Sequence, residues 1–214
     1  MNQKIIAEEQ QYTLVTNLDD FLRTRRSFRG FLPQPVPPDI LNCVLETPTF
    51  TPSENNHQPW RFATLTSVDA KGKLADAMGV DFRRDLCKSG LPDNKISERL
   101  IRSRYRILST PVASLLSMDN SEMGVYADDL CGQAELTLAV QSTTLAGLQL
   151  MLANHAEGLG SVWTCGPLFV SETVRFALGL SGKWYPQAMF FLGYLSKEPE
   201  PRARKSTREI SIWM

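Results

Sequence analysis

A basic segment near the beginning of the chain has the side chains that phosphate recognition requires. Three arginines and a serine lie within five positions, which are Arg25, Arg26, Ser27, Phe28 and Arg29. A guanidinium is always charged and can donate two parallel hydrogen bonds to phosphate oxygens. The segment is therefore a candidate receptor for a dianionic phosphate, with a solvated basic turn as an equally weighted alternative. A second basic pair, Arg202 and Arg204, could close the same site from the other end of the chain, although such a pair is more often a solvated tail.

A polar loop between two prolines is the second candidate. It consists of Pro52, Ser53, Glu54, Asn55, Asn56, His57, Gln58 and Pro59. A rigid loop of amides and hydroxyls can present donors and acceptors to the edge of a heterocycle. The alternative is an exposed turn, and His57 by itself is more typical of a loop than of a base or ligand.

A glycine-rich run, Gly158 to Gly166, is the third candidate, because glycine lets a backbone approach a ligand closely. The run lacks the lysine of a phosphate loop and the G-x-G-x-x-G spacing, which excludes both of those nucleotide-binding motifs. Cys165 follows a predicted strand within it. No histidine or aspartate can be assigned to activate this thiol, so a nucleophilic role is disfavoured.

The elements that must position these residues alternate helices with spaced strands, which predicts one α+β layered domain over residues 1–214. Helices are expected from Asn17, from Pro38, from an Asp69 cap to Gly79, and over residues 128–157. Strands are expected at 60–68, 111–118, 161–164 and 187–195. Residues 1–16 form an N-terminal extension, and residues 80–127 form a variable region that could cap a substrate.

The long helix over residues 128–157 is apolar on nearly all sides, which indicates burial partly by a second subunit. The charged tail from residue 197 to 214 ends in apolar residues, Ile210 to Trp213. Our preferred interpretation pairs this end with a sheet edge of a second chain.

Composition excludes several classes of function. The 214 residues include 23 Lys plus Arg and 23 Asp plus Glu, so the net charge is zero, which disfavours nucleic-acid and anionic-membrane binding. Four dispersed cysteines and two histidines argue against a metal site and for reduced thiols in the cytoplasm. No signal-peptide core and no run of about 18 apolar residues is present, so we expect no membrane span.

Taken together, the order of these motifs resembles the FMN-dependent nitroreductase family. The matching segments are Arg25–Phe31, Pro35–Pro37, Pro52–Phe62, Gly158–Trp163 and Pro201–Arg204. The resemblance covers residues 18–210. Within the family, Leu74–Met78 and Glu98–Arg102 are most similar to the reductase domain of deazaflavin-coenzyme biosynthesis.

The resemblance implies a layered sandwich with a central, mostly antiparallel sheet flanked by helices, in an intertwined homodimer with FMN at the subunit interface. Arg25, Arg26, Ser27 and Arg29 would hold the phosphate and the pyrimidine side of the flavin, and Arg202 and Arg204 would complete the phosphate site. Pro52, Ser53 and Glu54 would approach from the partner subunit, with Asn56 also at the cofactor. Thr164, Cys165 and Gly166 would lie along the isoalloxazine edge, although many relatives carry a Glu-Gly pair after this motif.

The implied reaction is a ping-pong hydride transfer from NADH or NADPH, through FMN, to a flat electron-poor substrate such as a nitroaromatic, quinone or enone. The flavin carries the redox chemistry, so no catalytic acid or base is expected. The alternatives are a deazaflavin-precursor reductase, a flavin-binding protein without turnover, and a structural module with a chance basic cluster.

Overall fold

A computed structural model of the chain describes residues 17–121, 123–124 and 128–214. The predicted N-terminal extension, residues 1–16, lies outside the described residues. After a helical segment at residues 17–24, the elements are α2 (Pro38–Glu46), η1 (Thr47–Phe50), η2 (Glu54–Asn56), β1 (Trp60–Leu65), α3 (Val68–Lys88), α4 (Asp93–Ser109), β2 (Val112–Asp119), α5 (Asp129–Ala156), β3 (Leu159–Thr164), α6 (Gly166–Phe169), α7 (Ser171–Leu178), β4 (Trp184–Tyr194) and α8 (Thr207–Ile210).

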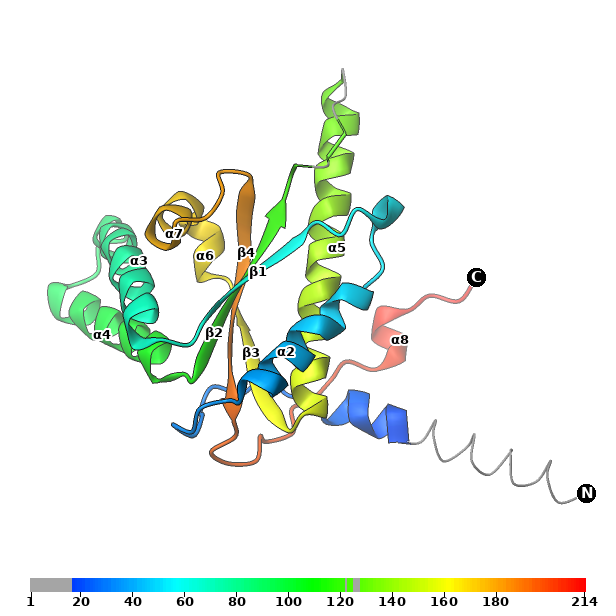
Figure 1. The fold of residues 1–214 in the computed structure, drawn as a ribbon, viewed down its shortest axis with the longest axis horizontal. Coiled ribbons are helices and arrows are strands. Elements are labelled where there is room, and N and C mark those ends of the chain that lie inside the picture. The colour runs from blue at the N-terminus through cyan, green and yellow to red at the C-terminus, as the bar shows by residue number, and fades with distance from the viewer. Residues whose placement is uncertain (1–16, 122, 125–127) are drawn as a thin grey trace, which may run out of the picture.

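The four strands form one antiparallel sheet in the order β1-β2-β4-β3 (Figure 1). The register places Leu115 of β2 opposite Met189 of β4, and Val162 of β3 opposite Phe191. A shift between Leu116 and Ser117 marks a bulge in the central β2–β4 pair. The predicted antiparallel α+β sandwich is therefore confirmed, whereas one chain does not show the expected dimer.

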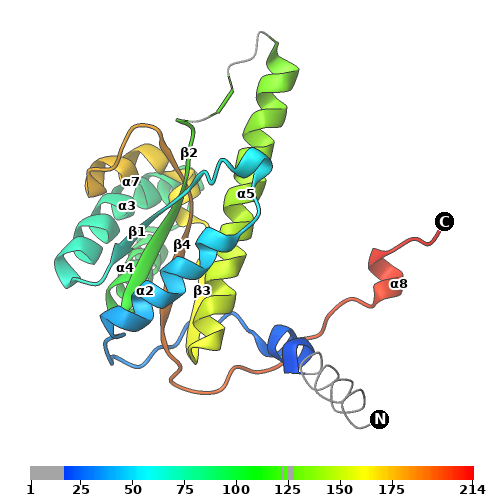
Figure 2. The same cartoon turned by 45° about the vertical axis from the view of Figure 1, so that its right-hand side comes forward.

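Helices cover both faces of the sheet, because neighbouring residues of each strand point to opposite sides. In β4, Met189 and Phe191 face α3, α4 and α7, in a core that includes Leu74 and Val174. Phe190 faces α2 and α5, in a second core that includes Leu150. The three layers are visible in Figure 1 and Figure 2.

The expected cap and end of the third helix were wrong. Ser67, not Asp69, is the N-cap of α3, and its Oγ accepts a hydrogen bond from the N–H of Ala70 at 3.2 Å. The helix then continues through Gly79 to Lys88. Gly79 keeps helical geometry, and the left-handed backbone that ends the segment occurs at Gly90, with φ of 70°.

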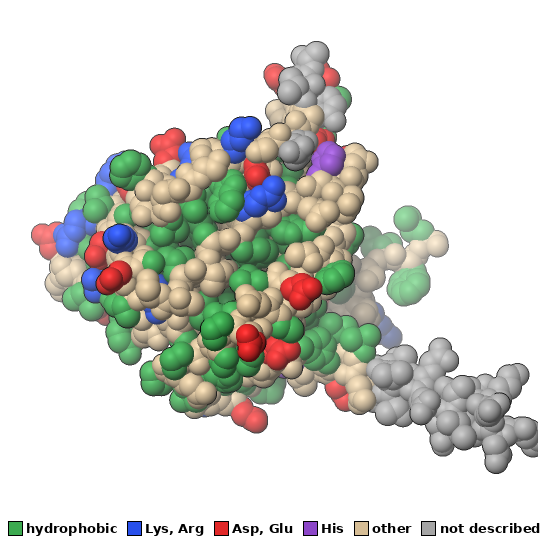
Figure 3. All heavy atoms as spheres, in the orientation of Figure 1, with side chains coloured by type: hydrophobic (Ala, Val, Ile, Leu, Met, Phe, Trp, Pro, Cys, Tyr) green, Lys and Arg blue, Asp and Glu red, His purple; other side chains and the backbone are tan. Residues whose placement is uncertain are grey.

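The predicted variable region, residues 80–127, contains a fully buried central strand, β2. Only its helical part, the end of α3 and all of α4, lies at the periphery of the sheet (Figure 1). Charged side chains of both signs lie close together on this side of the molecule (Figure 3). The substrate-capping role of residues 80–127 stays a prediction, and among the described residues α3 and α4 are the peripheral elements that could fill it.

The long helix α5 is close to the predicted range and begins at an Asp128 cap, whose carboxylate accepts from the Cys131 N–H at 2.8 Å. It is the one helix in the described part of the chain whose length and hydropathy would allow it to cross a membrane, a test that the core helix of a folded domain also passes. One of its faces packs on the sheet through Ala146 and Leu150. This packing accounts for the apolar residues on one face of α5, whereas Leu145 and Leu148 stay exposed in the single chain.

The C-terminal tail leaves the body of the molecule after β4 (Figure 2). Ile210 ends a short helix, α8, instead of beginning a strand, because Ser206 and Glu209 form a capping box. Trp213 is 92% exposed, and apolar side chains lie at the exposed tip (Figure 3). Pairing of this tail with a second chain stays a prediction.

Candidate functional site

The basic segment lies along the edge strand β3. Ser27 forms a parallel bridge with Ser161, and the Phe28 N–H donates to the Ser161 carbonyl at 3.0 Å. The Phe28 ring is buried, whereas Ser27 and Arg29 on either side of it are exposed. Anchoring at Phe28 therefore directs the polar side chains away from the core.

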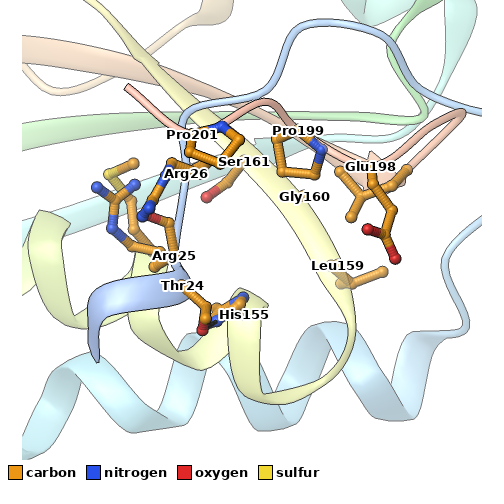
Figure 4. A pocket seen from close by; sticks show the side chains of 12 residues that line it. Thr24, Arg25, Arg26, His155, Leu159, Gly160, Ser161, Glu198, Pro199 and Pro201 are labelled. Carbon is orange, nitrogen blue, oxygen red and sulfur yellow. Dashed lines mark hydrogen bonds between the residues drawn. The ribbon is translucent and has the colours of Figure 1, made fainter. Parts of the chain in front are cut away.

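A pocket of about 390 Å³ opens between this segment, the end of α5 and the chain that follows β4. Figure 4 shows Arg25 and Arg26 on one side of it, Thr24 with His155 at one end, and Glu198 away from the arginines. The other lining residues are Met151, Leu159, Gly160, Ser161, Leu195, Pro199 and Pro201.

Arg25 is the half-buried cation of this pocket. Its Nη1 is buried and has no hydrogen-bond partner among the described residues. Burial, followed by the charges of Arg204 and Arg26, lowers the pKa of Arg25. Arg204 is therefore close enough to repel Arg25 electrostatically, although neither Arg202 nor Arg204 lines the pocket. That both clusters hold one phosphate stays a prediction.

The other arginines of the two clusters contribute differently. The Arg26 guanidinium donates to the carbonyls of Arg23 and Arg25, the latter at 2.9 Å, which holds it beside the pocket. The Arg204 guanidinium donates to the carbonyls of Arg202 and Ala203 at 3.3 and 3.1 Å. Arg202 and Arg204 are exposed.

His155 and Thr24 add a polar pair that the sequence did not predict. The Thr24 Oγ1 lies 3.0 Å from Nε2 of His155, and Phe21 stacks on the imidazole with ring centroids 4.9 Å apart. Burial and the charges of Arg25 and Arg26 lower the pKa of His155. The neutral form of the imidazole is therefore favoured more than in a free histidine, at the edge of a cationic pocket.

The polar loop of residues 52–58 lies elsewhere in the same chain. The Glu54 N–H donates to the Ser142 Oγ at 3.4 Å, and Ser142 precedes His155 by 13 residues of α5, or roughly 20 Å. The structure therefore does not bring Pro52, Ser53, Glu54 or Asn56 to the arginine pocket within one chain.

This loop nevertheless has an unusual backbone. Asn55, Asn56 and Gln58 have positive φ values of 45°, 59° and 48°, a conformation that non-glycine residues seldom adopt outside constrained sites. A hydrogen bond from the Gln58 N–H to the Ser53 Oγ, at 3.0 Å, helps to hold it. Three potential metal ligands also lie together among the described residues. One carboxylate oxygen each of Glu54 and of the buried Glu135 of α5 and one imidazole nitrogen of His57 lie within 4.8 Å of one another.

A second pocket, of about 140 Å³, contains three of the predicted flavin contacts, Arg29, Thr164 and Gly166. Residues of α3 and α4 complete its wall, namely Met78, Ser103, Arg106 and Ile107, above Phe31, Met189 and Phe191. The Thr164 Oγ1 donates to the Met189 carbonyl at 2.7 Å, so this hydroxyl belongs to the sheet. Cys165 is exposed and does not line the pocket.

Comparison with known proteins decides the family. The model of the Nitroreductase family matches residues 22–194, which is most of the chain. The chain belongs to the Nitroreductase family. The resemblance inferred from the arginine, proline and glycine motifs is thereby confirmed.

Individual relatives of this nitroreductase-family chain agree with that assignment. YfhC of Bacillus subtilis (strain 168) is 28% identical over 192 residues, covering 90% of this chain and 91% of that protein. A chloronitrobenzene nitroreductase of Comamonas testosteroni is 49% identical over 60 residues, which cover 28% of this chain and 26% of that protein. The crystal structure of the FMN-dependent nitroreductase NfnB from Mycobacterium smegmatis, in complex with NADPH, matches with a TM-score of 0.70 at 19% identity and covers 94% of this chain and 99% of that one.

The nitroreductase motifs did not point to every pocket residue. Thr24, His155 and Glu198 reach the first pocket, and Ser103 and Arg106 reach the second, from segments without a sequence signal of their own. Arg106 lies in the arginine-rich part of α4, and this composition was the only feature of the sequence that pointed to a role for Arg106.

Proposed function

We propose that this member of the Nitroreductase family is an FMN-dependent enzyme that reduces flat, electron-poor substrates with electrons from NADH or NADPH. The observation that carries the proposal is a pocket lined by Arg25 and Arg26 in which a buried guanidinium nitrogen of Arg25 has no hydrogen-bond partner among the described residues, with the charge of Arg204 close enough to act on it. A phosphate group would supply the missing acceptor and offset the repulsion between the cations. The FMN-dependent, NADPH-bound relative supports this choice of cofactor and donor.

The residues present fit FMN in the following arrangement. Arg25, Arg26 and Ser27, with Arg202 and Arg204, would hold the phosphate at the larger pocket. Arg29, Thr164, Cys165 and Gly166 would border the ring near the smaller pocket. When bound, FMN supplies the redox chemistry, exchanging a hydride with its two substrates in turn.

The protein itself would act through position and charge. Hydride transfer needs no protein acid or base, so the chain is required to hold flat rings in contact and to exclude water. Arg29 at the smaller pocket would also stabilise negative charge on the reduced ring.

A homodimer would complete the site. Pro52, Ser53, Glu54 and Asn56 lie far from the arginine pocket of their own chain, so we propose that they serve the pocket of the partner subunit. The apolar surface of α5 that the sheet leaves uncovered would form the interface. The four cysteines are all free and exposed, which supports the proposed cytoplasmic location.

The visible absorption spectrum of the purified protein, with identification of any released chromophore, tests the cofactor. We expect a yellow protein containing FMN, bleached by NADH or NADPH and reoxidised by menadione or nitrobenzene. A colourless protein without affinity for FMN would overturn the proposal. Bound FMN that neither nicotinamide reduces would indicate a deazaflavin-precursor reductase or a flavin-binding protein without turnover instead.

A further inference from the structure

The smaller pocket combines an apolar floor with two free cations. Phe31, Met189 and Phe191 form part of its lining, and Arg29 and Arg106 bring guanidinium groups to it from separate segments of the chain. Neither arginine has a hydrogen-bond or ion-pair partner among the described residues. An apolar surface beside unpaired cations favours a ligand that is flat, apolar and negatively charged at its edge.

Arg106 differs from the arginines near it on α4. Arg102 is paired with Glu98 at 2.9 Å, and Arg104 is paired with Asp76 at 2.7 Å. Arg106 has no such partner, and it lies in the last turn of the helix, where Ile107 beside it is buried in the core. Its charge is therefore available to a ligand in the pocket, and the packing of α4 fixes the position from which it reaches.

The size of the pocket limits the ligand. Its volume of about 140 Å³ is close to the ~150 Å³ cavity that accommodates one benzene ring. Ser103, one turn before Arg106 on α4, adds a hydroxyl donor at the same wall. One six-membered ring with one polar substituent fits this combination better than a fused polycyclic compound does.

We propose that this pocket is a substrate subsite for single-ring aromatic compounds that carry a carboxylate, and that Arg106 is the residue that selects for the carboxylate. A guanidinium can donate two parallel hydrogen bonds to a carboxylate. This pair of bonds would increase the affinity for the ligand and also orient its ring. The inference rests on the proposed function, because Arg29, Thr164 and Gly166 would place the reactive ring of the cofactor beside the same pocket.

The test compares charged and neutral ligands of the same ring. Binding of benzoate to the purified holoprotein is measured by calorimetry, and kcat/KM is measured for 4-nitrobenzoate and for nitrobenzene. The variants are Arg106→Ala, Arg106→Lys and, as the matched control, Arg99→Ala. Arg99 is an exposed arginine two helical turns earlier on α4, without a hydrogen-bond or ion-pair partner among the described residues and outside the pocket.

We expect Arg106→Ala to weaken benzoate binding about tenfold or more and to lower kcat/KM for 4-nitrobenzoate by a similar factor. In Arg106→Ala, kcat/KM for nitrobenzene should change less than about twofold. Arg106→Lys should lose less benzoate affinity than Arg106→Ala does, because lysine keeps the charge. Arg99→Ala should bind benzoate and reduce both nitro compounds as the parent does. A melting-temperature measurement on each variant shows that the folded state is retained.

Two results would overturn the inference: equal benzoate affinity in the parent and in Arg106→Ala, or an equal loss for 4-nitrobenzoate and nitrobenzene. Failure of the proposed function gives a different pattern. If no nitro compound is reduced, but benzoate binding still falls only in the Arg106 variants, the pocket assignment holds and the oxidoreductase assignment does not.

Discussion

At the scale of single residues, Arg25 presents a conflict between stability and binding. Part of its guanidinium is buried without a hydrogen-bond partner among the described residues, and burial, followed by neighbouring positive charge, lowers its pKa. Such a group costs free energy in the protein alone and becomes favourable when an anion arrives. The arginine therefore fits a binding role better than a structural one.

Replacing Arg25 with Gln tests this conflict. FMN affinity should fall about 10- to 100-fold, the range expected for loss of charge-assisted hydrogen bonds, while the melting temperature without ligand should stay the same or rise. The control is Arg23→Gln, because Arg23 is exposed and pairs with Asp19 at 2.7 Å outside the pocket. A variant of Arg25 that binds FMN as tightly as the parent does would contradict the assignment.

His155 gives the phosphate pocket an expected pH dependence. Burial and then Arg25 and Arg26 hold the pKa of His155 below its ordinary value, which favours the neutral imidazole before an anion binds. A bound phosphate favours the imidazolium and raises this pKa, so binding takes up a proton and tightens as pH falls from 8 towards 6.

The pH dependence is measured as the Kd for FMN at several pH values in the parent and in His155→Gln. Protonation of the phosphate itself, near pH ~6, affects both proteins equally, so the difference between them isolates the histidine. Identical pH profiles would show that His155 does not respond to the ligand. Glu198, the acidic residue lining the same pocket, is unchanged in both proteins.

The sequence was sufficient to propose the arginine clusters as a phosphate site, because residue type and spacing favour phosphate chemistry as much as a solvated turn. It could not identify His155, which reaches Thr24 only because α5 ends beside the N-terminal segment. A single histidine in a long apolar helix carries no signal until the fold gives it charged neighbours.

At the scale of secondary-structure elements, the contact between α5 and the sheet depends on Gly147. A Cβ at this position would lie 2.5 Å from Trp163, 2.9 Å from Leu116 and 3.0 Å from Phe190. The glycine therefore lets the backbone of α5 lie close to strands β2, β3 and β4, and β3 borders the arginine pocket.

The substitution Gly147→Ala should lower the melting temperature, because crowding in a packed core costs about 1–3 kcal/mol and outweighs the helix propensity that alanine adds. Gly132 lies in the same helix with nothing within 4 Å of a Cβ, so Gly132→Ala should raise the melting temperature instead. Thermal denaturation of both variants checks the pair, and stabilisation by Gly147→Ala would show that α5 does not pack this closely.

Helix α3 shows why the boundaries of elements were harder to predict than their existence. Asp69 and Gly79 have the residue types of a cap and a terminator, but Ser67 is also a good cap and is better placed by the end of β1. Gly79 ends no helix because α3 continues against α4 on this side of the sheet. Tertiary packing therefore overrode two local signals that were reasonable by themselves.

At the scale of the whole molecule, a single chain leaves a large apolar surface uncovered. Leu145 and Leu148 on α5 are 46% and 47% exposed, and Ile212 in the tail is 88% exposed. Leu145 and Leu148 lie one helical turn apart on α5, and neighbouring exposed apolar residues are typical of an interface. The dimer that we propose would cover them and bring the 52–58 loop to the partner's pocket.

Sedimentation velocity tests the dimer. We expect the parent to sediment as a dimer and the double variant Leu145→Lys, Leu148→Lys to sediment as a monomer with much weaker FMN binding. The control is Val80→Lys on α3, which introduces the same charge at a 70% exposed position on the other side of the sheet. A monomeric parent that retains FMN would contradict the shared site.

The central claim is that arginines from both ends of the chain bind the phosphate of a flavin nucleotide. The most direct measurement is the affinity of the flavin-free protein for FMN and for riboflavin, which has the same ring and side chain but no phosphate. We predict that FMN binds at least about 100-fold more tightly, and that most of this difference disappears in Arg25→Gln. Equal affinity for the two flavins would contradict the claim.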